Sequence, residues 1–546
     1  MVMGMTHKAR QHHDDARLGD EQLQPLTADW SDQEHASSDD DNMKLSTQRN
    51  DESADGVVVE VAPTSEQPPA YEDFDGQGRL IEYRVYRQRW FGLIQLSLLN
   101  IIVSWDWLSF APVSDISASY FSVSETAINW LSTAFLFAFC VSSPAVIWTL
   151  NKGGPKPAII VASVLILAGN WIRYAGTRSG PNGHFGVVML GQILIGLAQP
   201  FVLSAPTRYS DLWFTDQGRI SATALASLAN PFGGALGHLI DPFLATKAKH
   251  IPNMVFFSID SILKTQSSIS TLPSFFLASA PPTPPSASSL TPKPPLKAAV
   301  RTLLRSADFY LIFIPFATYV TLFNTLSTIL AQTLTPYNYS AQTAGIIGGL
   351  LILTGLVSAA ITSPLVDHYK SHLLAIKLLV PLLGLTYILF PIAPPTRTLA
   401  APLTLSCALG AASFSLVPVA LEWLAESTYP LSPEAGSTLC WAGGQFGGAV
   451  LVIAMDALKG VGGRPKGNMQ AALWFMGALA IVVVPVPVFG LGKWGTRGKG
   501  RRWEIERSSR GAGGSRSSSS GASGSRRGRA GASGINHVDD GEDRGV

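Results

Sequence analysis

Three consecutive residues, Trp105, Asp106 and Trp107, place a carboxylate between two indole side chains within an apolar stretch. An ionisable residue at membrane depth is costly and therefore indicates a functional role. The faces of indole rings attract organic cations, quaternary ammonium groups in particular. A neighbouring carboxylate would add a counter-charge or a site for proton coupling. In the alternative interpretation the two indoles lie at the outer membrane–water boundary, where placing the carboxylate of Asp106 costs little free energy.

Two glutamines, Gln199 and Gln445, lie in two other apolar stretches. A lone amide in such a stretch usually bonds to a neighbouring helix. Gln445, however, lies in the Gly-rich segment 443–448, which resembles segment 230–234 (Asn-Pro-Phe-Gly-Gly). Glycine pairs let helices approach closely, and Pro231 permits local unwinding beside a cavity. These features predict a substrate site between two similar halves.

Other chemistry-bearing residues are sparse. Glu422 and Glu426 are four apart on one helix face, where they could serve proton linkage, gating or structure. His238 is the only histidine deep in an apolar run; it is either a packed residue or an axial ligand for heme. The cysteines Cys140 and Cys407, like Cys440, fall in apolar stretches, so neither a disulfide framework nor a metal site is expected. No nucleophile or phosphate-binding loop stands out, and we expect neither an enzyme nor a cofactor.

The composition indicates that these residues lie in a membrane protein. Of 546 residues, 47% are hydrophobic and only 14% are charged, against about 25% charged in soluble domains. The apolar stretches approach the ~20 residues that cross a bilayer as a helix. The predicted spans are Trp90–Val113, Ala127–Leu150, Pro157–Ala175, Phe185–Pro206, Ile220–Leu244, one within Ile251–Ala280, Phe309–Leu334, Ala344–Val366, Leu373–Pro391, Leu399–Ala425, Gly436–Leu458 and Ala471–Leu491.

The order of these spans predicts two six-helix halves. Segment 232–235 (Phe-Gly-Gly-Ala) in the first half recurs as 446–449 in the second. Secondary transporters are commonly built from such parallel repeats. The predicted organisation is a tail (1–88), a first half (89–280), a central cytoplasmic loop (281–307), a second half (308–492) and a basic tail (493–546).

Both tails have the composition of disordered segments, because neither can bury enough apolar surface to offset the conformational entropy that is lost on ordering. Positive residues flank the first and last spans and predict that both termini are cytoplasmic, in agreement with an even span number. No cleaved signal peptide is expected, because the first apolar run begins beyond residue 88. The Arg-rich tail favours an anchor on the anionic inner leaflet over binding to nucleic acid.

The N-terminal tail carries a recognition motif. Pro68, Pro69 and Tyr71 form a PPxY sequence, which docks as an extended segment into the aromatic groove of a WW domain. In a cytosolic tail it indicates recruitment of a ubiquitin ligase for endocytosis or sorting. The alternative is a chance match in a Pro-containing linker.

The sixth span is unusually polar, since it contains Asp260, Lys264 and Gln266. Asp260 and Lys264 could form an internal ion pair. Alternatively, residues 260–269 reflect a gene-model error, because their removal leaves about 20 mostly apolar residues, one span in length. We favour the error.

Several motifs in order resemble the feline leukaemia virus subgroup C receptor-related transporters of the major facilitator superfamily, from about Arg89 to Leu491. They are Trp107, 128–132 (Ile-Asn-Trp-Leu-Ser), 189–192 (Met-Leu-Gly-Gln), 198–199, 206–208 with 213–214, 326–332 (Leu-Ser-Thr-Ile-Leu-Ala-Gln), and 418–422 (Pro-Val-Ala-Leu-Glu) running on to Glu426, 428–430 and Gly436. The resemblance implies an all-α major facilitator fold of about 12 transmembrane helices in two pseudo-symmetric halves.

The resemblance also implies alternating access and a substrate site. The family's choline site is an aromatic cage closed by amides, to which Trp107, Gln199 and Gln445 correspond. In the seventh span Asn324 stands where relatives carry a tyrosine, with Tyr319 upstream. Among the other motif positions, we assign coupling or gating to Asp106, Arg208, Asp367, Glu422 and Glu426. Asp367 keeps the acidic residue of a gating loop, whereas the first half has Asn151 there.

The predicted function is secondary transport of a small organic solute, a cation or amino alcohol such as choline or ethanolamine. The family has also been linked to heme export and, in a neighbouring branch, to pyridoxine, so these are alternative substrates. A non-transporting nutrient receptor is a further alternative, because of the long tails and the PPxY motif. We expect a monomer in the plasma membrane or a vacuolar or lysosomal membrane.

Overall fold

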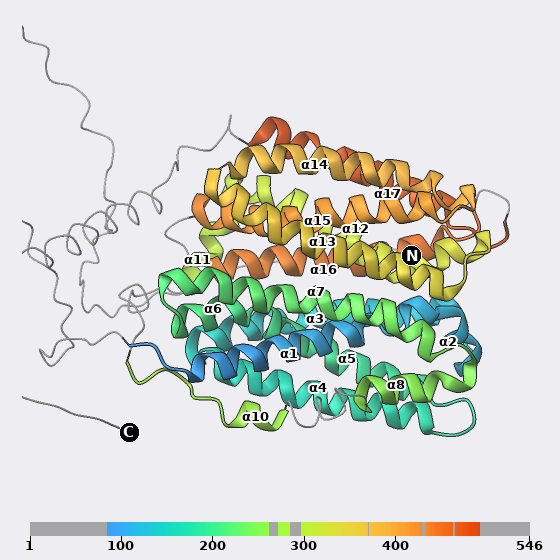
Figure 1. The fold of residues 1–546 in the computed structure, drawn as a ribbon, viewed down its shortest axis with the longest axis horizontal. Coiled ribbons are helices and arrows are strands. Elements are labelled where there is room, and N and C mark those ends of the chain that lie inside the picture. Colours follow the sequence, from blue (N-terminus) through green and yellow to red (C-terminus); the bar gives the residue numbers. More distant parts are fainter. Residues whose placement is uncertain are drawn as a thin grey trace, which may run out of the picture. The chain divides into compact units, whose positions relative to one another are not determined.

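The computed structural model describes residues 84–260, 271–283, 296–369, 371–428, 433–461 and 465–491, and all regular elements in this part of the chain are helical (Figure 1). Residues 1–83 with the PPxY motif, residues 261–270 and the C-terminal tail lie outside it. The first-half helices are α1 (Gln88–Leu108), α2 (Ser114–Phe121), α3 (Glu125–Gly153), α4 (Pro155–Arg178), α5 (Phe185–Leu203), α6 (Ala205–Trp213), α7 (Asp216–Leu244), α8 (Ile251–Asp260) and α10 (Thr271–Phe275). The later helices are α11 (Leu296–Leu303), α12 (Ala307–Leu334), α13 (Ala341–Tyr369), α14 (His372–Leu389), α15 (Ala400–Ser427), α16 (Pro433–Ala457) and α17 (Gln470–Val483). Short 3-10 or π turns are η1 (Ala111–Val113), η2 (Ala248–His250), η4 (Thr335–Tyr337), η5 (Phe390–Ile392), η6 (Pro394–Thr396) and η7 (Val486–Gly490).

Ten segments of the described chain are long and apolar enough to cross a membrane. They correspond to the first four and the last six predicted spans. The fifth span is the helix α7, whose 29 residues correspond to about 43 Å of helix, longer than the ~30 Å hydrocarbon core. It is not among the ten because Asn230, His238 and Asp241 make it more polar. The sixth predicted span is represented by α8 and α10, on either side of residues 261–270.

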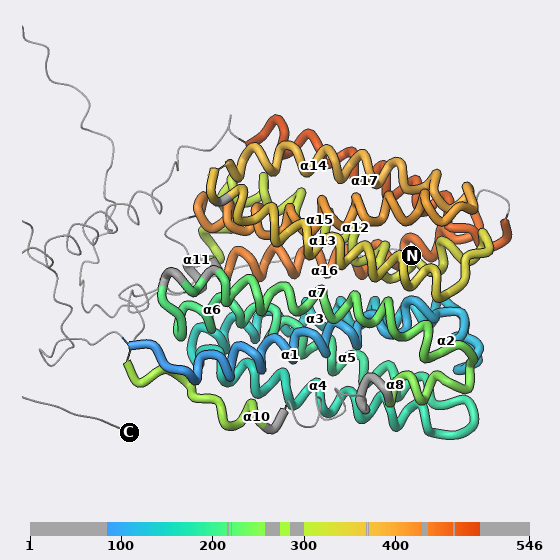
Figure 2. Tube along the Cα trace, viewed as in Figure 1, coloured from blue at the N-terminus to red at the C-terminus, as the bar shows by residue number. Residues whose placement is uncertain are grey.

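The helices group by half, with the blue and green helices on one side and the yellow to red helices on the other (Figures 1 and 2). Within the first half α1 packs on α7 and α4 on α5; within the second half α12 packs on α16 and α13 on α15. The halves meet mainly through two helix pairs, α7 with α13 and α3 with α16. A substrate path between the halves would therefore be bounded by these two pairs.

The repeated Phe-Gly-Gly-Ala segment occupies equivalent packing positions in the two halves. A Cβ atom on Gly233 of α7 would overlap the carbonyl oxygen of Ile101 on α1. A Cβ on Gly447 of α16 would overlap the hydroxyl of Thr321 on α12. Each glycine thus permits the close approach of corresponding helices, the fifth span to the first and the eleventh to the seventh. This arrangement explains the repeat.

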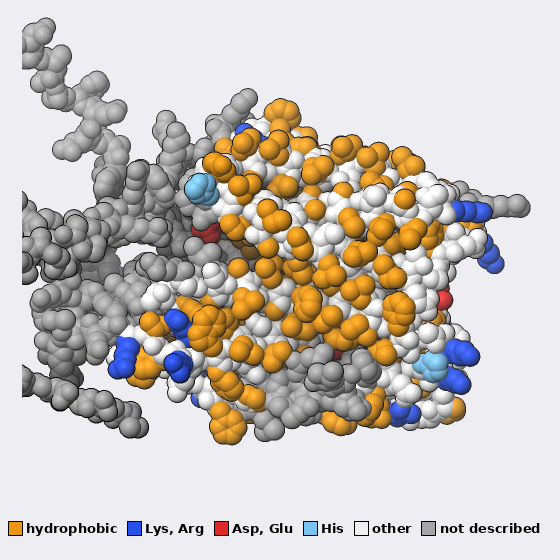
Figure 3. Space-filling model, viewed as in Figure 1, with side chains coloured by type: hydrophobic (Ala, Val, Ile, Leu, Met, Phe, Trp, Pro, Cys, Tyr) orange, Lys and Arg blue, Asp and Glu red, His pale blue; other side chains and the backbone are white. Residues whose placement is uncertain are grey.

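Large apolar side chains cover the visible face of the helices across both halves (Figure 3). Several aromatic residues are strongly exposed, among them Trp148, Phe243 and Phe489. Soluble monomers rarely expose contiguous apolar patches of more than a few hundred Å². The exposed surface is therefore suited to contact with lipid.

Candidate functional site

Two predicted amides meet at the contact between α12 and α16. The Nδ2 group of Asn324 donates a hydrogen bond to Oε1 of Gln445 over 2.7 Å. Both side chains are buried, with exposed fractions of 3%. A Cβ atom on Gly448, one turn beyond Gln445, would lie only 3.1 Å from the Cβ of Asn324. Because Gly448 leaves this room, the asparagine side chain fits against α16 and reaches the glutamine.

The other two predicted site residues, Trp107 and Gln199, lie on α1 and α5 of the first half. The indole of Trp107 stacks on Phe135 of α3, with ring centroids 6.2 Å apart and an interplanar angle of 18°. Both residues are buried, yet the indole Nε1 and the amide Oε1 of Gln199 have no hydrogen-bond partner. Buried polar groups are almost always paired. These two unpaired groups are therefore candidates for contact with a bound molecule.

Helix α3 connects the two groups of site residues. Phe135 contacts Trp107, whereas the adjacent Leu136 faces the second half. A Cβ atom on Gly448 would lie 3.3 Å from Cδ1 of Leu136, beside Asn324. Two adjacent residues of α3 thus contact Trp107 on one hand and the neighbourhood of the amide pair on the other.

Tyr319 faces elsewhere. Its hydroxyl donates hydrogen bonds to the carbonyl oxygens of Val380 on α14 and Ala480 on α17, over 3.2 and 3.0 Å. Its ring stacks on Tyr387, also on α14. The structure therefore places this side chain inside the second half and does not bring its hydroxyl to the amide pair.

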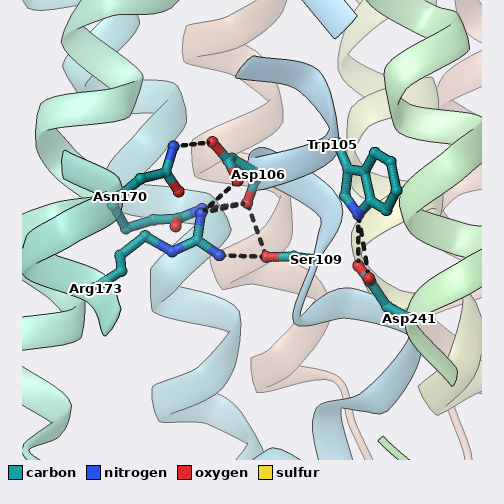
Figure 4. Close-up of polar contacts among 7 residues, drawn as sticks. Trp105, Asp106, Ser109, Asn170, Arg173 and Asp241 are labelled. Atoms are coloured by element: carbon teal, nitrogen blue, oxygen red, sulfur yellow. Dashed lines mark hydrogen bonds and ion pairs between the residues drawn. The ribbon is translucent and has the colours of Figure 1, made fainter. Parts of the chain in front are cut away.

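Asp106 takes part in a buried ion pair that the sequence analysis missed (Figure 4). Its carboxylate lies 3.0 Å from the guanidinium of Arg173 on α4, and both side chains are almost fully buried. Asn170, one turn earlier on α4, donates to the other carboxylate oxygen over 2.6 Å. Arg173 also donates to Ser109 over 2.6 Å. Arg173 lies within the third predicted span. Its charge at membrane depth is the sequence feature that could have indicated this ion pair.

The two indoles beside Asp106 point in other directions. Trp105 reaches α7, where its Nε1 group donates to the carboxylate of Asp241 at 3.1 and 3.2 Å (Figure 4). Trp107 faces α3. Successive side chains of a helix diverge by about 100° because a turn takes 3.6 residues. The carboxylate of Asp106 is therefore directed to α4 and is no direct counter-charge for a cation on the Trp107 ring.

A polar network joins the halves where α3 begins and where α12 and α16 end. Asn129 of α3 and Gln332 of α12 exchange hydrogen bonds of 2.6 and 3.4 Å. Asn129 also donates to Asp456 of α16 over 3.2 Å. Lys459 donates to Gln332 over 3.3 Å and forms an ion pair with Glu125. By the predicted topology this network, the outer network below, lies at the outer end of the molecule.

The remaining predicted gating residues are separate from this network. Arg208 of α6 forms an ion pair with Asp211 over 3.3 Å, and Arg219 of α7 binds the same carboxylate at the same distance. On α15 the side chain of Glu422 is exposed and that of Glu426 is half-buried. The side chain of Asp367 lies outside the described part of the structure, as do Pro68, Pro69 and Tyr71. Within the described residues, no three His, Cys, Asp or Glu side chains gather to hold a metal ion.

Comparison with known proteins agrees with this architecture. Residues 96–454 match the family model of the Major Facilitator Superfamily. The fold is similar to that of a bacterial homologue of the human lysosomal transporter Spinster, in an inward-facing and unoccupied conformation, with a TM-score of 0.53 at 14% identity over 74% of this chain and 96% of that one. The nucleoside transporter NupG gives the same TM-score at 12% identity, over 73% and 99% of the two chains. The chain therefore belongs to the Major Facilitator Superfamily and is a multi-pass membrane transporter, not an enzyme.

Sequence relatives of this chain indicate its branch within the superfamily. It is 33% identical to Solute carrier family 49 member A3 of Danio rerio, over 69% of this chain and 80% of that protein. It is 27% identical to Choline/ethanolamine transporter FLVCR1 of Felis catus, over 73% and 72% of the two chains. The predicted relationship to the feline leukaemia virus subgroup C receptor-related branch is confirmed.

Proposed function

We propose that this transporter carries a small organic cation or amino alcohol, such as choline or ethanolamine, between its two halves. The observation that carries the proposal is the buried Trp107, with its unpaired indole N–H, together with the unpaired amide oxygen of Gln199. The names of relatives such as Choline/ethanolamine transporter flvcr2b of Danio rerio, 27% identical, favour the same substrates.

The chemistry of the four predicted site residues suits such a substrate. They are Trp107, Gln199, Asn324 and Gln445. An aromatic face attracts a quaternary ammonium group by about 0.5–2 kcal/mol. The amide oxygen of Gln199 can accept a hydrogen bond from a substrate hydroxyl or primary ammonium. The stacked ring of Phe135 supplies a second aromatic group beside Trp107. The pair of Asn324 and Gln445 supplies polar groups on the side of the second half.

Alternating access is supported by the way the halves meet. The outer network ties α3 to α12 and α16, so the outer end is closed in this conformation. At the other end of α16 a contact between halves is the 3.4 Å hydrogen bond between Thr438 and Ser204, the residue that follows α5. We infer that a substrate reaches Trp107 from the cytoplasmic end in this conformation.

The test is uptake and efflux of labelled choline and ethanolamine in cells that express the chain. Saturable flux is expected, and Trp107→Ala should reduce it at least tenfold because it removes the cation-binding ring. Trp474→Ala is the matched control, since that tryptophan lies on α17 with 44% of its surface exposed. Absence of flux with the protein present in its membrane would overturn the proposal, as would equal loss in the two variants.

A further inference from the structure

A cavity of about 180 Å³ lies where α1 begins, between α1, α6 and residues 276–278, which follow α10. Tyr209 and Trp213 of α6 line it with buried side chains. Gln88 and Phe91 of α1 line it with exposed ones. A water molecule takes up about 30 Å³ in the liquid. This space, the α1 cavity below, therefore has room for a group of several heavy atoms, such as a phosphate.

Hydrogen bonds hold the segment that follows α10 beside the start of α1. The side-chain amide of Gln95 on α1 donates to the hydroxyl of Ser274 on α10 over 2.8 Å. The hydroxyls of Tyr86, just before α1, and Thr283 are hydrogen-bonded over 3.2 Å. These two contacts lie on either side of residues 276–278 along the chain. The wall of the α1 cavity is thus fixed to α1 by the fold.

Trp213 carries a hydrogen-bond donor without a partner. Its side chain is buried and its ring stacks on Tyr209, but the indole Nε1 makes no hydrogen bond. Buried polar groups are almost always paired. The hydroxyl of Tyr209, by contrast, donates to the carbonyl oxygen of Arg89 over 2.9 Å. The indole N–H of Trp213 is therefore the donor that remains for a ligand in the α1 cavity.

The mouth of the α1 cavity is positively charged. Arg84 and Arg87 are exposed just before α1, and neither forms an ion pair with another described residue. Gln88 is the first residue of α1, and no side chain caps this helix end. The N-terminus of a helix attracts anions through its free N–H groups and its dipole. These features favour an anion that accepts hydrogen bonds.

Apolar side chains beside the α1 cavity face outward. Phe276 is 81% exposed, and Trp90 and Phe91 are also exposed. The guanidinium of Arg89 lies 5.3 Å from the ring centroid of Trp90. Positive side chains lie among apolar ones at the end of the molecule where α1 begins (Figure 3). Aromatic and basic residues gather in this way at a membrane–water interface. By the predicted topology this interface is the cytoplasmic one, where the leaflet contains anionic lipids.

We propose that the α1 cavity binds the phosphate group of an anionic phospholipid, such as phosphatidylserine. The phosphate accepts a hydrogen bond from Nε1 of Trp213 and pairs with Arg87, since a guanidinium matches the geometry of phosphate oxygens. The acyl chains lie against Phe91 and Phe276 and continue into the bilayer. These exposed rings favour a lipid over a free phosphate ion, which gains nothing from apolar contacts. The lipid site does not depend on which solute the transporter carries.

The test is lipid binding by the purified full-length protein, measured by native mass spectrometry. Phosphatidylserine and phosphatidylcholine with the same acyl chains are offered in equal amounts, and preferential retention of phosphatidylserine is expected. Trp213→Phe keeps an aromatic ring but removes the N–H group, so the affinity for phosphatidylserine should fall about tenfold. Trp423→Phe is the matched control, because its indole Nε1 is also buried and unpaired but lies on α15.

A second pair of variants separates the site from general surface charge. Arg87→Gln should lower the affinity for phosphatidylserine about fivefold. Arg305→Gln, the control, removes an exposed arginine just before α12 in the second half and should change nothing. Equal losses in these two variants would overturn the site. Equal retention of both lipids by the wild type, or an unchanged affinity in Trp213→Phe, would do the same.

The final arm distinguishes a lipid from a free phosphate. Inorganic phosphate and glycerophosphoserine, which lacks acyl chains, are added at the concentration of the lipid. Neither should displace bound phosphatidylserine, because neither can contact Phe91 and Phe276. Displacement by either compound would assign the α1 cavity to a soluble phosphate and overturn the lipid assignment.

Discussion

At the scale of single residues, three neighbours in one turn of α1 contact three different helices. They are Trp105, Asp106 and Trp107. Trp105 binds Asp241 on α7, Asp106 pairs with Arg173 on α4, and Trp107 stacks against α3. The side chains are adjacent in sequence but separated in space. Asp106 is therefore a residue that fixes α1 to α4, and of the three only Trp107 has a polar side-chain atom without a hydrogen-bond partner.

Removal of the Asp106 carboxylate tests this structural role. Asp106→Asn leaves the guanidinium of Arg173 buried without a counter-charge, which costs about 3–5 kcal/mol. We expect a marked fall in the melting temperature of the purified protein. The double variant Asp106→Asn with Arg173→Met should recover part of the loss, because no unpaired charge remains.

A control variant and a contrary result make the test decisive. Asp115→Asn changes an exposed carboxylate of α2 and should alter the free energy of unfolding by less than about 0.5 kcal/mol. If Asp106→Asn melts like the wild type, Asp106 is not held as a buried ion and its pairing with Arg173 contributes nothing to stability.

At the scale of helices, small residues and polar contacts decide which elements lie together. Glycines allow α7 to approach α1, and α16 to approach α12, in equivalent ways. The halves are joined by glycine-mediated packing of α13 on α7 and, at one end, by polar groups of α3, α12 and α16. These polar groups supply hydrogen bonds to the contact between the halves.

The close approach of α7 to α1 predicts a strong effect of one methyl group. Gly233→Ala would make a Cβ atom overlap the carbonyl oxygen of Ile101. Such overpacking costs about 1–3 kcal/mol, so thermal stability should fall. Gly186→Ala in α5 is the matched control, because no atom lies within 4 Å of its added Cβ. Equal stability of the two variants would show that α1 and α7 are not in this contact.

The outer network predicts a shift in conformation. Asn129→Ala removes hydrogen bonds to Gln332 and Asp456, each worth about 1 kcal/mol. Loss of the three hydrogen bonds, about 3 kcal/mol in all, should raise the ratio of open to closed molecules at the outer end about a hundredfold. Spin labels at positions 126 and 461, in a background without native cysteines, would report it as a longer distance between α3 and the end of α16.

The result for this variant has its own control. Thr404→Ala removes an exposed hydroxyl that bonds only within α15, to Ala400 and Ala401. Its distance distribution should match that of the wild type. An unchanged distribution in Asn129→Ala would mean that the outer network does not hold the two halves together.

At the scale of the whole molecule, hydropathy was sufficient to predict the helical membrane fold. In the described chain, ten of the twelve predicted spans are helices that are long and apolar enough to cross a membrane. The fifth predicted span coincides with α7, which is not among these ten segments. The assignment of residues to a substrate site stays a prediction. Side-chain type marked Trp107, Gln199, Asn324 and Gln445, but their partners depend on helix rotation.

The partners that were missed share a physical cause. Arg173 and Asp241 lie far from Asp106 and Trp105 in sequence, so only the packing of α4 and α7 on α1 brings them together. Tyr319 was assigned to the site from its spacing along α12, yet it faces α14 and α17. Sequence gives the residue types at membrane depth, whereas rotation of each helix about its axis decides which of them meet. Heme as a substrate and the PPxY interaction stay predictions.

The most direct measurement is counterflow of labelled choline into proteoliposomes of the purified protein preloaded with unlabelled choline. It depends on neither a proton gradient nor a membrane potential. Alternating access to a cation site at Trp107 predicts a transient accumulation of label inside, lost in Trp107→Ala and kept in Trp474→Ala. A folded protein that gives no accumulation with choline or ethanolamine would contradict transport of these solutes by this chain.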